Sequence, residues 1–285
     1  MNHIKGTTSL SGLIGYPVKH SKSPQMHNTA FEALGLDYVY LAFEVQEGNL
    51  KKAVEAMKTL NAIGFNVTMP YKTKVLEYLD DISEEARIIG SVNTVKNENG
   101  RLIGYNTDGI GFIKSLEEKG VNYVGEKIVI VGAGGAARAI ATQLAFDGVA
   151  EIVLFNRTLS KAEEIVKSIN MNISTCRSRA LGMDESVLRK EIEDAAILIN
   201  CTSIGMWPEI DKSIISSPEV LHKDLFVADI IYEPNKTKLL KFAEKAGCKY
   251  MNGLMMVIWQ GALAFKIWTG KDMPVDLIKK AVFEK

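Results

Sequence analysis

The sequence has no excess of charge of either sign, because its 285 residues include 34 Lys plus Arg and 34 Asp plus Glu. Binding to nucleic acid or to a membrane surface usually needs a strong basic field, so we expect neither partner. Cysteine is scarce too, and the three cysteines are widely spaced and odd in number. This pattern fits neither a disulfide framework nor a cysteine metal site. We expect Cys176, Cys201 and Cys248 to be small core residues of a protein of the reducing cytoplasm.

Long apolar runs are also missing. The most apolar stretch, residues 253–265, is too short to cross a bilayer and is interrupted by Gln260. Residues 1–11 lack the apolar core of a signal peptide. With 47% hydrophobic and 24% charged residues, a chain of this length can bury a large core. We expect two domains.

What the sequence does contain is a strand, a glycine-rich turn and a helix within residues 127–161. The β-branched run 128–131 predicts a buried parallel strand, and a second strand at 151–155 follows at the interval expected of a dinucleotide-binding unit. In the turn, Gly132 allows a sharp bend and Gly134 lets a pyrophosphate approach the backbone. We predict that five turn residues bind this cofactor: Gly132, Ala133, Gly134, Gly135 and Ala136.

The residues after the second strand indicate which dinucleotide is bound. An NAD site would place Asp or Glu there, whereas this chain has Asn156, Arg157 and Thr158, with Lys161 one helical turn later. Arg157 and Lys161 can pair with a 2'-phosphate, and Thr158 can donate a hydrogen bond to it. We therefore predict NADP, although the same cations could be ordinary solvated charges. Thr202 follows a further buried run, where small residues would pass under the dinucleotide.

The N-terminal third alternates strands and helices, with strands expected at 10–15, 38–45 and 64–68 and a helix at 50–60. Ser23 precedes Pro24, which is a helix start signal, so Ser23 is expected to cap the helix or, together with Ser21, to bind a carboxylate. Ser83 is expected to cap a short helix over 84–89.

Two further polar turns carry groups able to do chemistry. Lys72 ends the turn that begins at Asn66, and most lysines in such turns are simply solvated. A hairpin with its turn at 97–100 leads back to Asp108, which could cap the helix 110–118, serve in catalysis, or do both. Residues 175–184 form a polar region with no element assigned, and a mostly buried helix is expected over 253–268.

Taken together, these turns resemble the shikimate dehydrogenase family over nearly the whole chain. The matching motifs occur in the family's order: Ser21-Lys22-Ser23-Pro24, Asn66-Val67-Thr68-Met69-Pro70-Tyr71-Lys72, Ser91-Val92-Asn93-Thr94, Asn106-Thr107-Asp108-Gly109, the glycine turn, Asn156-Arg157-Thr158 and Gln260-Gly261-Ala262. The resemblance implies reversible NADP-linked reduction of 3-dehydroshikimate to shikimate, in aromatic amino acid biosynthesis.

The resemblance also implies a role for each matching residue. Lys72 and Asp108 would be the catalytic pair, and the substrate would be bound by Ser21, Ser23, Thr68, Asn93, Tyr232 and Gln260. Gly253 would join the cofactor site. The implied fold is α/β, with an N-terminal substrate domain and a Rossmann-type NADP-binding domain that meet at an interdomain groove. The substrate domain would comprise 1–108 and 253–285, the cofactor domain 109–252, and the protein would be a monomer or homodimer.

The residue types account for this chemistry. Lys72, as an ammonium, can stabilise negative charge on the ketone oxygen and donate a proton, while Asp108 orients the lysine and a substrate hydroxyl. No metal is needed. Two alternatives remain open at this point. One is a quinate/shikimate dehydrogenase that accepts NAD, and the other is a non-catalytic NADP-binding regulator on the same fold.

Overall fold

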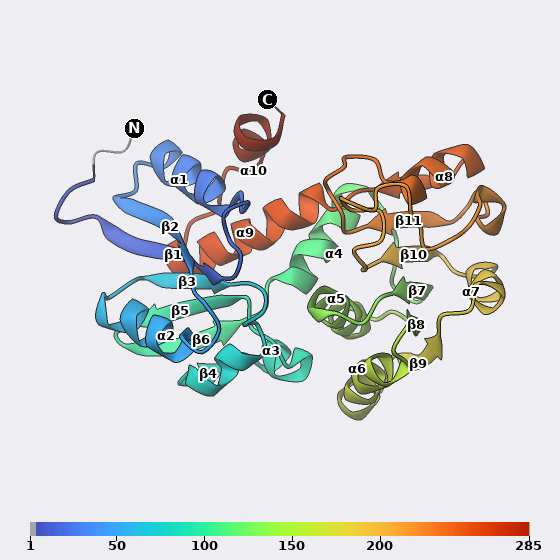
Figure 1. The fold of residues 1–285 in the computed structure, drawn as a ribbon, viewed down its shortest axis with the longest axis horizontal. Helices are drawn as coiled ribbons and strands as arrows, with labels where there is room; N and C mark the ends of the chain where they lie inside the picture. Colours follow the sequence, from blue (N-terminus) through green and yellow to red (C-terminus); the bar gives the residue numbers. More distant parts are fainter. Residues whose placement is uncertain (1–3, 285) are drawn as a thin grey trace. The chain divides into compact units, whose positions relative to one another are not determined.

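The computed structural model describes residues 4–284, which form two compact units. The first unit ends at Gly111 and resumes at Ile258, and the second runs from Phe112 to Val257. Each unit combines one six-stranded sheet with helices (Figure 1). The predicted α/β class is therefore confirmed.

The chain passes from one unit to the other within two helices, α4 (Asp108–Glu118) and α9 (Leu254–Thr269). The domain bounds expected from the sequence fall at the beginnings of these same helices. Those bounds start at residue 1 and end at residue 285, and residues 1–3 and 285 lie outside the described part of the chain.

The sheet of the first unit has the strand order β2-β1-β3-β5-β6-β4. Strand β1 pairs in parallel with both β2 and β3, as expected of the βαβ rhythm. Strands β5 and β6 form the predicted antiparallel hairpin, whose turn places Asn99 and Gly100 at positive φ. The strands are β1 (Ser9–Gly15), β2 (Tyr38–Glu44), β3 (Gly64–Val67), β4 (Asp81–Ile82), β5 (Thr94–Glu98) and β6 (Arg101–Tyr105).

Helices pack on this sheet through buried apolar side chains. Leu50, Val54 and Met57 of α2 join a core cluster with β3 and β5. Helix α9 packs so closely on the sheet that Trp268 donates to the carbonyl of Val95 at 3.0 Å. A Cβ at Gly64 would meet the Trp268 ring at 2.3 Å, so only glycine fits there. The other helical segments of this unit are α1 (Ser23–Ala33), α2 (Leu50–Thr59), η1 (Lys74–Tyr78), α3 (Glu84–Ile89), α10 (Val275–Ile278) and η3 (Lys279–Phe283).

The second unit contains an all-parallel sheet with the order β12-β11-β10-β7-β8-β9. The order reverses beside β7, the strand that enters the glycine turn, and this reversal is where open α/β sheets bind ligands. The strands are β7 (Lys127–Val131), β8 (Glu151–Asn156), β9 (Arg177–Gly182), β10 (Ile197–Asn200), β11 (Phe226–Asp229) and β12 (Lys249–Met251).

Helices cover both faces of this parallel sheet. Ile128 and Ile130 pack in one core cluster with residues of α5 and α6, whereas Val129 and Val131 pack in another with residues of α7 and α8. Successive residues of a strand point to opposite faces, so a run of four apolar residues serves both layers. The helical segments are α5 (Gly135–Phe146), α6 (Leu159–Asn172), α7 (Glu185–Ile192), η2 (Pro218–Val220) and α8 (Lys238–Ala246).

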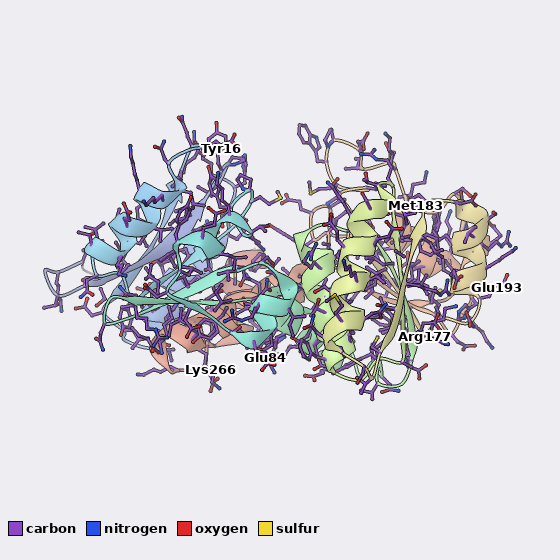
Figure 2. The ribbon with its side chains drawn as sticks, turned by 90° about the horizontal axis from the view of Figure 1, so that it is seen from below. Tyr16, Glu84, Arg177, Met183, Glu193 and Lys266 are labelled. Atoms are coloured by element: carbon purple, nitrogen blue, oxygen red, sulfur yellow. The ribbon has the colours of Figure 1, made fainter. Side chains whose placement is uncertain are left out.

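Two edge strands and a surface helix of the second unit were not predicted. The polar region 175–184 contains the edge strand β9, helix α7 follows it, and residues 249–251 form the opposite edge strand β12. Figure 2 labels Arg177 on β9 and Glu193 after α7, both with exposed side chains. Edge strands and surface helices need few buried residues, so they leave a weak hydrophobic pattern.

The cysteines are core residues as predicted, because Cys176, Cys201 and Cys248 are all buried and unpaired. Burial raises the pKa of each thiol. Within residues 4–284, no helix has the length and apolar character needed to cross a bilayer. Among the same residues, no three His, Cys, Asp or Glu side chains gather in a way that could hold a metal ion.

Candidate active site

Lys72 and Asp108 form an ion pair in the first unit. The lysine Nζ lies 2.5 Å from Asp108 Oδ2, and their side chains are 23% and 8% exposed. A surface ion pair would be largely screened by water, whereas this one is mostly enclosed. The ammonium group is still partly accessible, so it can reach a bound molecule.

The backbone after β3 places Lys72. The chain turns at Thr68, whose carbonyl accepts the amide of Tyr71 at 3.0 Å. The carbonyl of Lys72 then accepts the amide of Val92 at 2.8 Å, which ties the turn to the segment that precedes β5. Lys72 is therefore held at both ends of a short turn and is not a free surface lysine.

Asp108 is the first residue of α4. The side chain of Asn106 accepts the Asp108 amide at 3.1 Å. The carboxylate accepts from Lys72 and, at 2.8 Å, from Asn93 Nδ2. Both oxygens of the Asp108 carboxylate are therefore hydrogen bonded, one to Lys72 and the other to Asn93.

Ser23 was expected as a possible N-cap of α1, and this expectation is wrong. Lys22 occupies the N-cap position, Ser23 is the first helical residue, and its side chain makes no capping bond. The amide of Ser23 donates to Ser21 Oγ at 3.2 Å. Ser21 and Ser23 therefore both lie at the N-terminus of an 11-residue helix, where the helix dipole favours an anion.

The remaining predicted substrate residues lie in both units. Thr68 is half-buried, and its methyl group lies 2.2 Å from where a Cβ at Gly15 would be. A Cβ at Gly111 would meet the Gln260 backbone at 2.8 Å, so Gln260 of α9 lies one turn of α4 beyond Asp108. Tyr232 belongs to the second unit, where burial raises its pKa. The first unit thus contains all the predicted substrate residues except Tyr232.

The glycine turn of the second unit has the shape of an anion cradle. Gly132 adopts φ of 113°, and a Cβ there would meet the Cys201 carbonyl at 2.8 Å. Gly134 and Gly135 are exposed, and a Cβ on either would meet nothing within 4 Å. Helix α5 begins at Gly135 with no side chain capping its free amides. The turn 132–136, which also contains Ala133 and Ala136, therefore fits a pyrophosphate group.

A basic edge follows β8 in the same unit. Arg157, Thr158 and Lys161 are all exposed. Asn156 Nδ2 donates to the Thr158 carbonyl at 2.8 Å and holds the turn. In the described range, neither Arg157 nor Lys161 forms a salt bridge. Both cations are thus available to an anionic ligand.

Asp229 joins the loops that follow β10 and β11. Its Oδ1 accepts from Asn200 Nδ2 and from the Ile231 amide, each at 3.1 Å, and its Oδ2 accepts from Thr237 Oγ1 at 2.7 Å. Asn200 in turn accepts from the amide and the hydroxyl of Thr202. Burial raises the pKa of Asp229 to about 6, despite these donors. One carboxylate therefore organises the loop that contains Thr202.

Gly253 lies beyond β12, where the chain passes very close to β11. A Cβ at this position would lie 1.9 Å from the carbonyl oxygen of Ile230. The amide of Gly253 also donates to the Ile231 carbonyl at 3.0 Å. Only glycine permits this approach, so packing alone explains why position 253 is a glycine.

Asp229→Asn should make stability depend differently on pH. A carboxyl group whose pKa is higher in the folded than in the unfolded state lowers the free energy of unfolding when the pH is above the folded-state pKa. This destabilisation disappears as the pH falls below the unfolded-state pKa. A rise from 3.8 to about 6 is worth roughly 3 kcal/mol at most. Because asparagine carries no charge, the stability of the Asp229→Asn variant relative to wild type should improve as pH rises from 4 to 7. Urea midpoints measured across this range check the prediction.

Asp184→Asn is the matched control, since it should show the opposite trend. The Ser186 hydroxyl and two backbone amides lower the pKa of Asp184 at the start of α7. Its stabilising effect is present above the unfolded pKa and is lost as pH falls. The explanation for Asp229 is contradicted if both variants follow the same trend.

Sequence reasoning missed several polar residues behind the Lys72–Asp108 pair. Tyr40, Asn66, Thr94 and Thr107 are all buried and hydrogen bonded. A polar residue within an apolar strand could have indicated such a group in the sequence, because a polar side chain that is buried there needs a hydrogen-bond partner. Asn66 lies in the predicted strand 64–68 and shows this signal clearly.

The two units define an α/β protein whose second unit is of the Rossmann type and whose first unit contains a polar site around a lysine–aspartate pair. The chain belongs to the shikimate dehydrogenase family. Three family models match it in order: the shikimate dehydrogenase substrate binding domain over 13–95, shikimate / quinate 5-dehydrogenase over 115–230, and the shikimate 5'-dehydrogenase C-terminal domain over 253–283.

Individual relatives span the full chain. Shikimate dehydrogenase (NADP(+)) of Alkaliphilus metalliredigens is 57% identical over 282 residues, 99% of each chain. The crystal structure of shikimate 5-dehydrogenase from Listeria monocytogenes with shikimate and NAD has a TM-score of 0.96 at 47% identity, covering 99% of both chains. Quinate dehydrogenase from Corynebacterium glutamicum with NAD has a TM-score of 0.90 at 32% identity, covering 98% of this chain and 99% of that one.

Proposed function

We propose that this protein is an NADP-dependent shikimate dehydrogenase, which reversibly reduces 3-dehydroshikimate to shikimate in aromatic amino acid biosynthesis. The enclosed Lys72–Asp108 pair is the observation that carries the proposal. It supplies the two groups that the family's reaction requires, within a chain that matches relatives of that activity from end to end. A non-catalytic regulator would have no need of this pair.

The proposed substrate site uses the residues that the first unit brings together. Ser21 and Ser23, at the N-terminus of α1, suit the carboxylate of shikimate. Thr68, Asn93 and Gln260 offer hydroxyl and amide groups to the ring hydroxyls, and Tyr232 is proposed to complete the set. We accordingly assign substrate binding to the first unit, residues 1–108 with 253–285, and dinucleotide binding to 109–252.

The chemistry divides between a hydride and a proton. Bound NADPH would supply the hydride that reduces the ketone carbon of 3-dehydroshikimate. Lys72, as an ammonium, donates the proton to the oxygen on which negative charge develops, and its positive charge stabilises that oxygen meanwhile. Asp108 orients the lysine through their hydrogen bond and accepts from a substrate hydroxyl. In the reverse direction, neutral Lys72 takes the proton back.

The second unit fits NADP on two grounds. The open cradle of Gly132, Ala133, Gly134, Gly135 and Ala136 would receive the pyrophosphate on backbone amides. The unpaired cations Arg157 and Lys161 would bind the 2'-phosphate, with Asn156 and Thr158 shaping that turn. Thr202 and Gly253 are proposed to line the remainder of the cofactor site.

A second candidate is a quinate/shikimate dehydrogenase that also accepts NAD. The Listeria monocytogenes relative was crystallised with NAD, and a quinate dehydrogenase shares the fold at 32% identity. The basic edge at Arg157 and Lys161 favours NADP, because an NAD site gains from an acidic residue in this place.

One assay separates these candidates. Purified protein is offered shikimate and quinate in turn, each with NADP and with NAD, and formation of the reduced cofactor is followed by absorbance. We expect shikimate with NADP to give the highest kcat/KM by a wide margin. Strong oxidation of quinate with NAD would support the second candidate instead, and inactivity in all four combinations would overturn the proposal.

Ser23→Ala should raise the KM for shikimate about 10-fold, the cost of roughly one hydrogen bond to a charged group. The KM for NADP should stay unchanged. Because Ser23 does not cap α1, the thermal unfolding temperature should hardly move. Initial rates over a range of shikimate concentrations test this, and an unchanged KM would remove Ser23 from the substrate site.

Ser83→Ala is the matched control for Ser23→Ala. Ser83 does cap its helix, α3, by accepting the Ala86 amide at 3.2 Å. Its loss should lower stability by about 1 kcal/mol and leave the KM for shikimate as it is. The opposite pattern in the two variants would contradict the assignment of Ser23 to the carboxylate.

We also propose a cytoplasmic enzyme that acts as a monomer or homodimer. The three buried thiols fit a reducing compartment. Each unit has its own buried core and its own set of proposed site residues. Light scattering at working concentrations would establish the oligomeric state.

A further inference from the structure

A line of buried polar side chains lies behind the Lys72–Asp108 pair in the first unit. Its members are 0% to 6% exposed and lie within or beside the strands of the sheet: Tyr40, Asn66, Asn93, Thr94 and Thr107. Burying a hydroxyl or amide is costly unless it is hydrogen bonded. Each of these groups is bonded to another, so the line is a connected network and not a set of isolated polar residues.

The end of the network next to Asp108 has a defined direction. Asn93 Oδ1 accepts the backbone amide of Thr107 at 2.9 Å, and only an oxygen can do so. Asn93 Nδ2 must therefore point the other way, where it donates to Asp108 Oδ1 at 2.8 Å. The hydroxyl of Thr94 donates to the same Asn93 Oδ1 at 3.0 Å. Thr94 and the Thr107 amide thus hold the Asn93 amide in the orientation that supports Asp108.

The far end of the network has a direction as well. Asn66 Nδ2 donates to the Asn93 carbonyl and to Thr94 Oγ1, each at 3.0 Å. Because Thr94 Oγ1 accepts this bond, its own hydrogen remains for Asn93. Asn66 Oδ1 then faces Tyr40, whose hydroxyl donates to it at 2.8 Å.

Tyr40 itself is fixed in place. Its ring stacks on His27 with 4.4 Å between centroids, and its backbone forms two hydrogen bonds of 2.9 Å with the Asn28 side chain. The ring is fully buried, so its hydroxyl cannot turn to water in exchange for Asn66. The Tyr40 hydroxyl is therefore a preorganised donor at a single position.

We propose that Tyr40 and Thr94 are positioning residues of the active site, which fix the Asn66 and Asn93 amides so that Asp108 and Lys72 keep their reactive geometry. This inference rests on the proposed function, because it assigns these residues to the same reaction. Both side chains are 0% exposed, so they act through Asn93 and Asp108 and not by contact with a ligand.

Tyr40→Phe tests the first link, with Tyr38→Phe as its control. Tyr38 lies two residues earlier on β2 and contacts the Phe31 ring, so each variant removes one hydroxyl from the same strand. Losing the Tyr40 donor leaves Asn66 Oδ1 buried without a partner. We expect kcat for shikimate oxidation to fall about 10-fold in Tyr40→Phe, because losses of this size are common when a residue that orients an active-site group is replaced. The KM for NADP should not change.

Thr94→Val tests the second link, and Thr94→Ser is its conservative partner. Valine has the shape of threonine but cannot donate to Asn93, whereas serine keeps the hydroxyl. We expect Thr94→Val to lower kcat about 10-fold and Thr94→Ser to restore it to within about twofold of wild type. A purely structural role would lower the unfolding temperature of Thr94→Val without this loss and rescue of kcat.

Deuterium at the shikimate carbon that loses hydride adds a second readout. If the network serves the chemical step, the isotope effect on kcat should be larger in Tyr40→Phe and Thr94→Val than in wild type. Wild-type kcat in Thr94→Val, or equal kcat in Tyr40→Phe and Tyr38→Phe, would overturn the network's role. Inactive wild-type protein would instead overturn the proposed function. Thr94→Val and Thr94→Ser decide the matter if Tyr40→Phe does not fold.

Discussion

Lys72→Met should lower kcat by about 1,000-fold while NADP binding stays unchanged. General acid catalysis together with electrostatic stabilisation of an oxyanion is commonly worth 100-fold to 10,000-fold, and Lys72 is proposed to supply both. Methionine keeps much of the length of the side chain but has no proton and no charge. Steady-state rates give kcat, and fluorescence titration with NADPH gives the dissociation constant.

Lys74→Met is the matched control for this variant. Lys74 lies two residues beyond Lys72, at the start of η1, and it is exposed. Its replacement should leave kcat within about twofold of wild type, as is usual for a surface substitution. A Lys72→Met enzyme that retained a tenth or more of wild-type kcat would show that Lys72 is a binding residue and not the proton carrier.

Replacing both Arg157 and Lys161 with alanine should raise the KM for NADP about 100-fold and leave the KM for NAD almost unchanged. Each charged hydrogen bond to a phosphate contributes roughly 1.5–3 kcal/mol, which allows at least 10-fold per residue. NAD has no 2'-phosphate, so it loses nothing with these cations. Initial rates with shikimate at saturation, over a range of each cofactor, measure both constants.

Lys167→Ala serves as the control for the basic edge. Lys167 lies on the same helix as Lys161 and is exposed, but it is six residues further along and faces another direction. It should alter neither KM. If the double variant weakened NAD as much as NADP, Arg157 and Lys161 would be acting on the fold of the turn instead of on the 2'-phosphate.

The central strands of the second unit's sheet could be predicted from the sequence because they bury continuous apolar runs. Strand β7 and the glycine turn are the clearest case, since a β-branched run leads directly into a turn with three glycines. The edge strands β9 and β12 were missed for the opposite reason. In β9, Arg179 pairs with Glu151 and Glu191 at 3.0 and 2.8 Å, so charged side chains stabilise a strand whose own pattern is polar.

The start signals of helices show a second limit. Ser83 and Ser23 both precede a helical pattern, yet only Ser83 is an N-cap. Local sequence cannot distinguish the N-cap from the first helical residue, because the preferences of the two positions overlap and Pro24 is compatible with both readings. The difference depends on backbone dihedral angles that the surrounding structure sets.

The sequence by itself determined the α/β class, the glycine turn and the residue types of both proposed sites, since these depend on local patterns of apolar, small and charged residues. Only the tertiary structure decided which polar groups meet. Asn93 reaches Asp108 because the antiparallel register of β5 and β6 places Thr94 opposite Tyr105. Lys72 reaches the same carboxylate because its carbonyl binds the Val92 amide. Such contacts join residues far apart in the chain, and a hydrogen bond needs its two atoms within about 3 Å, which no local pattern can specify.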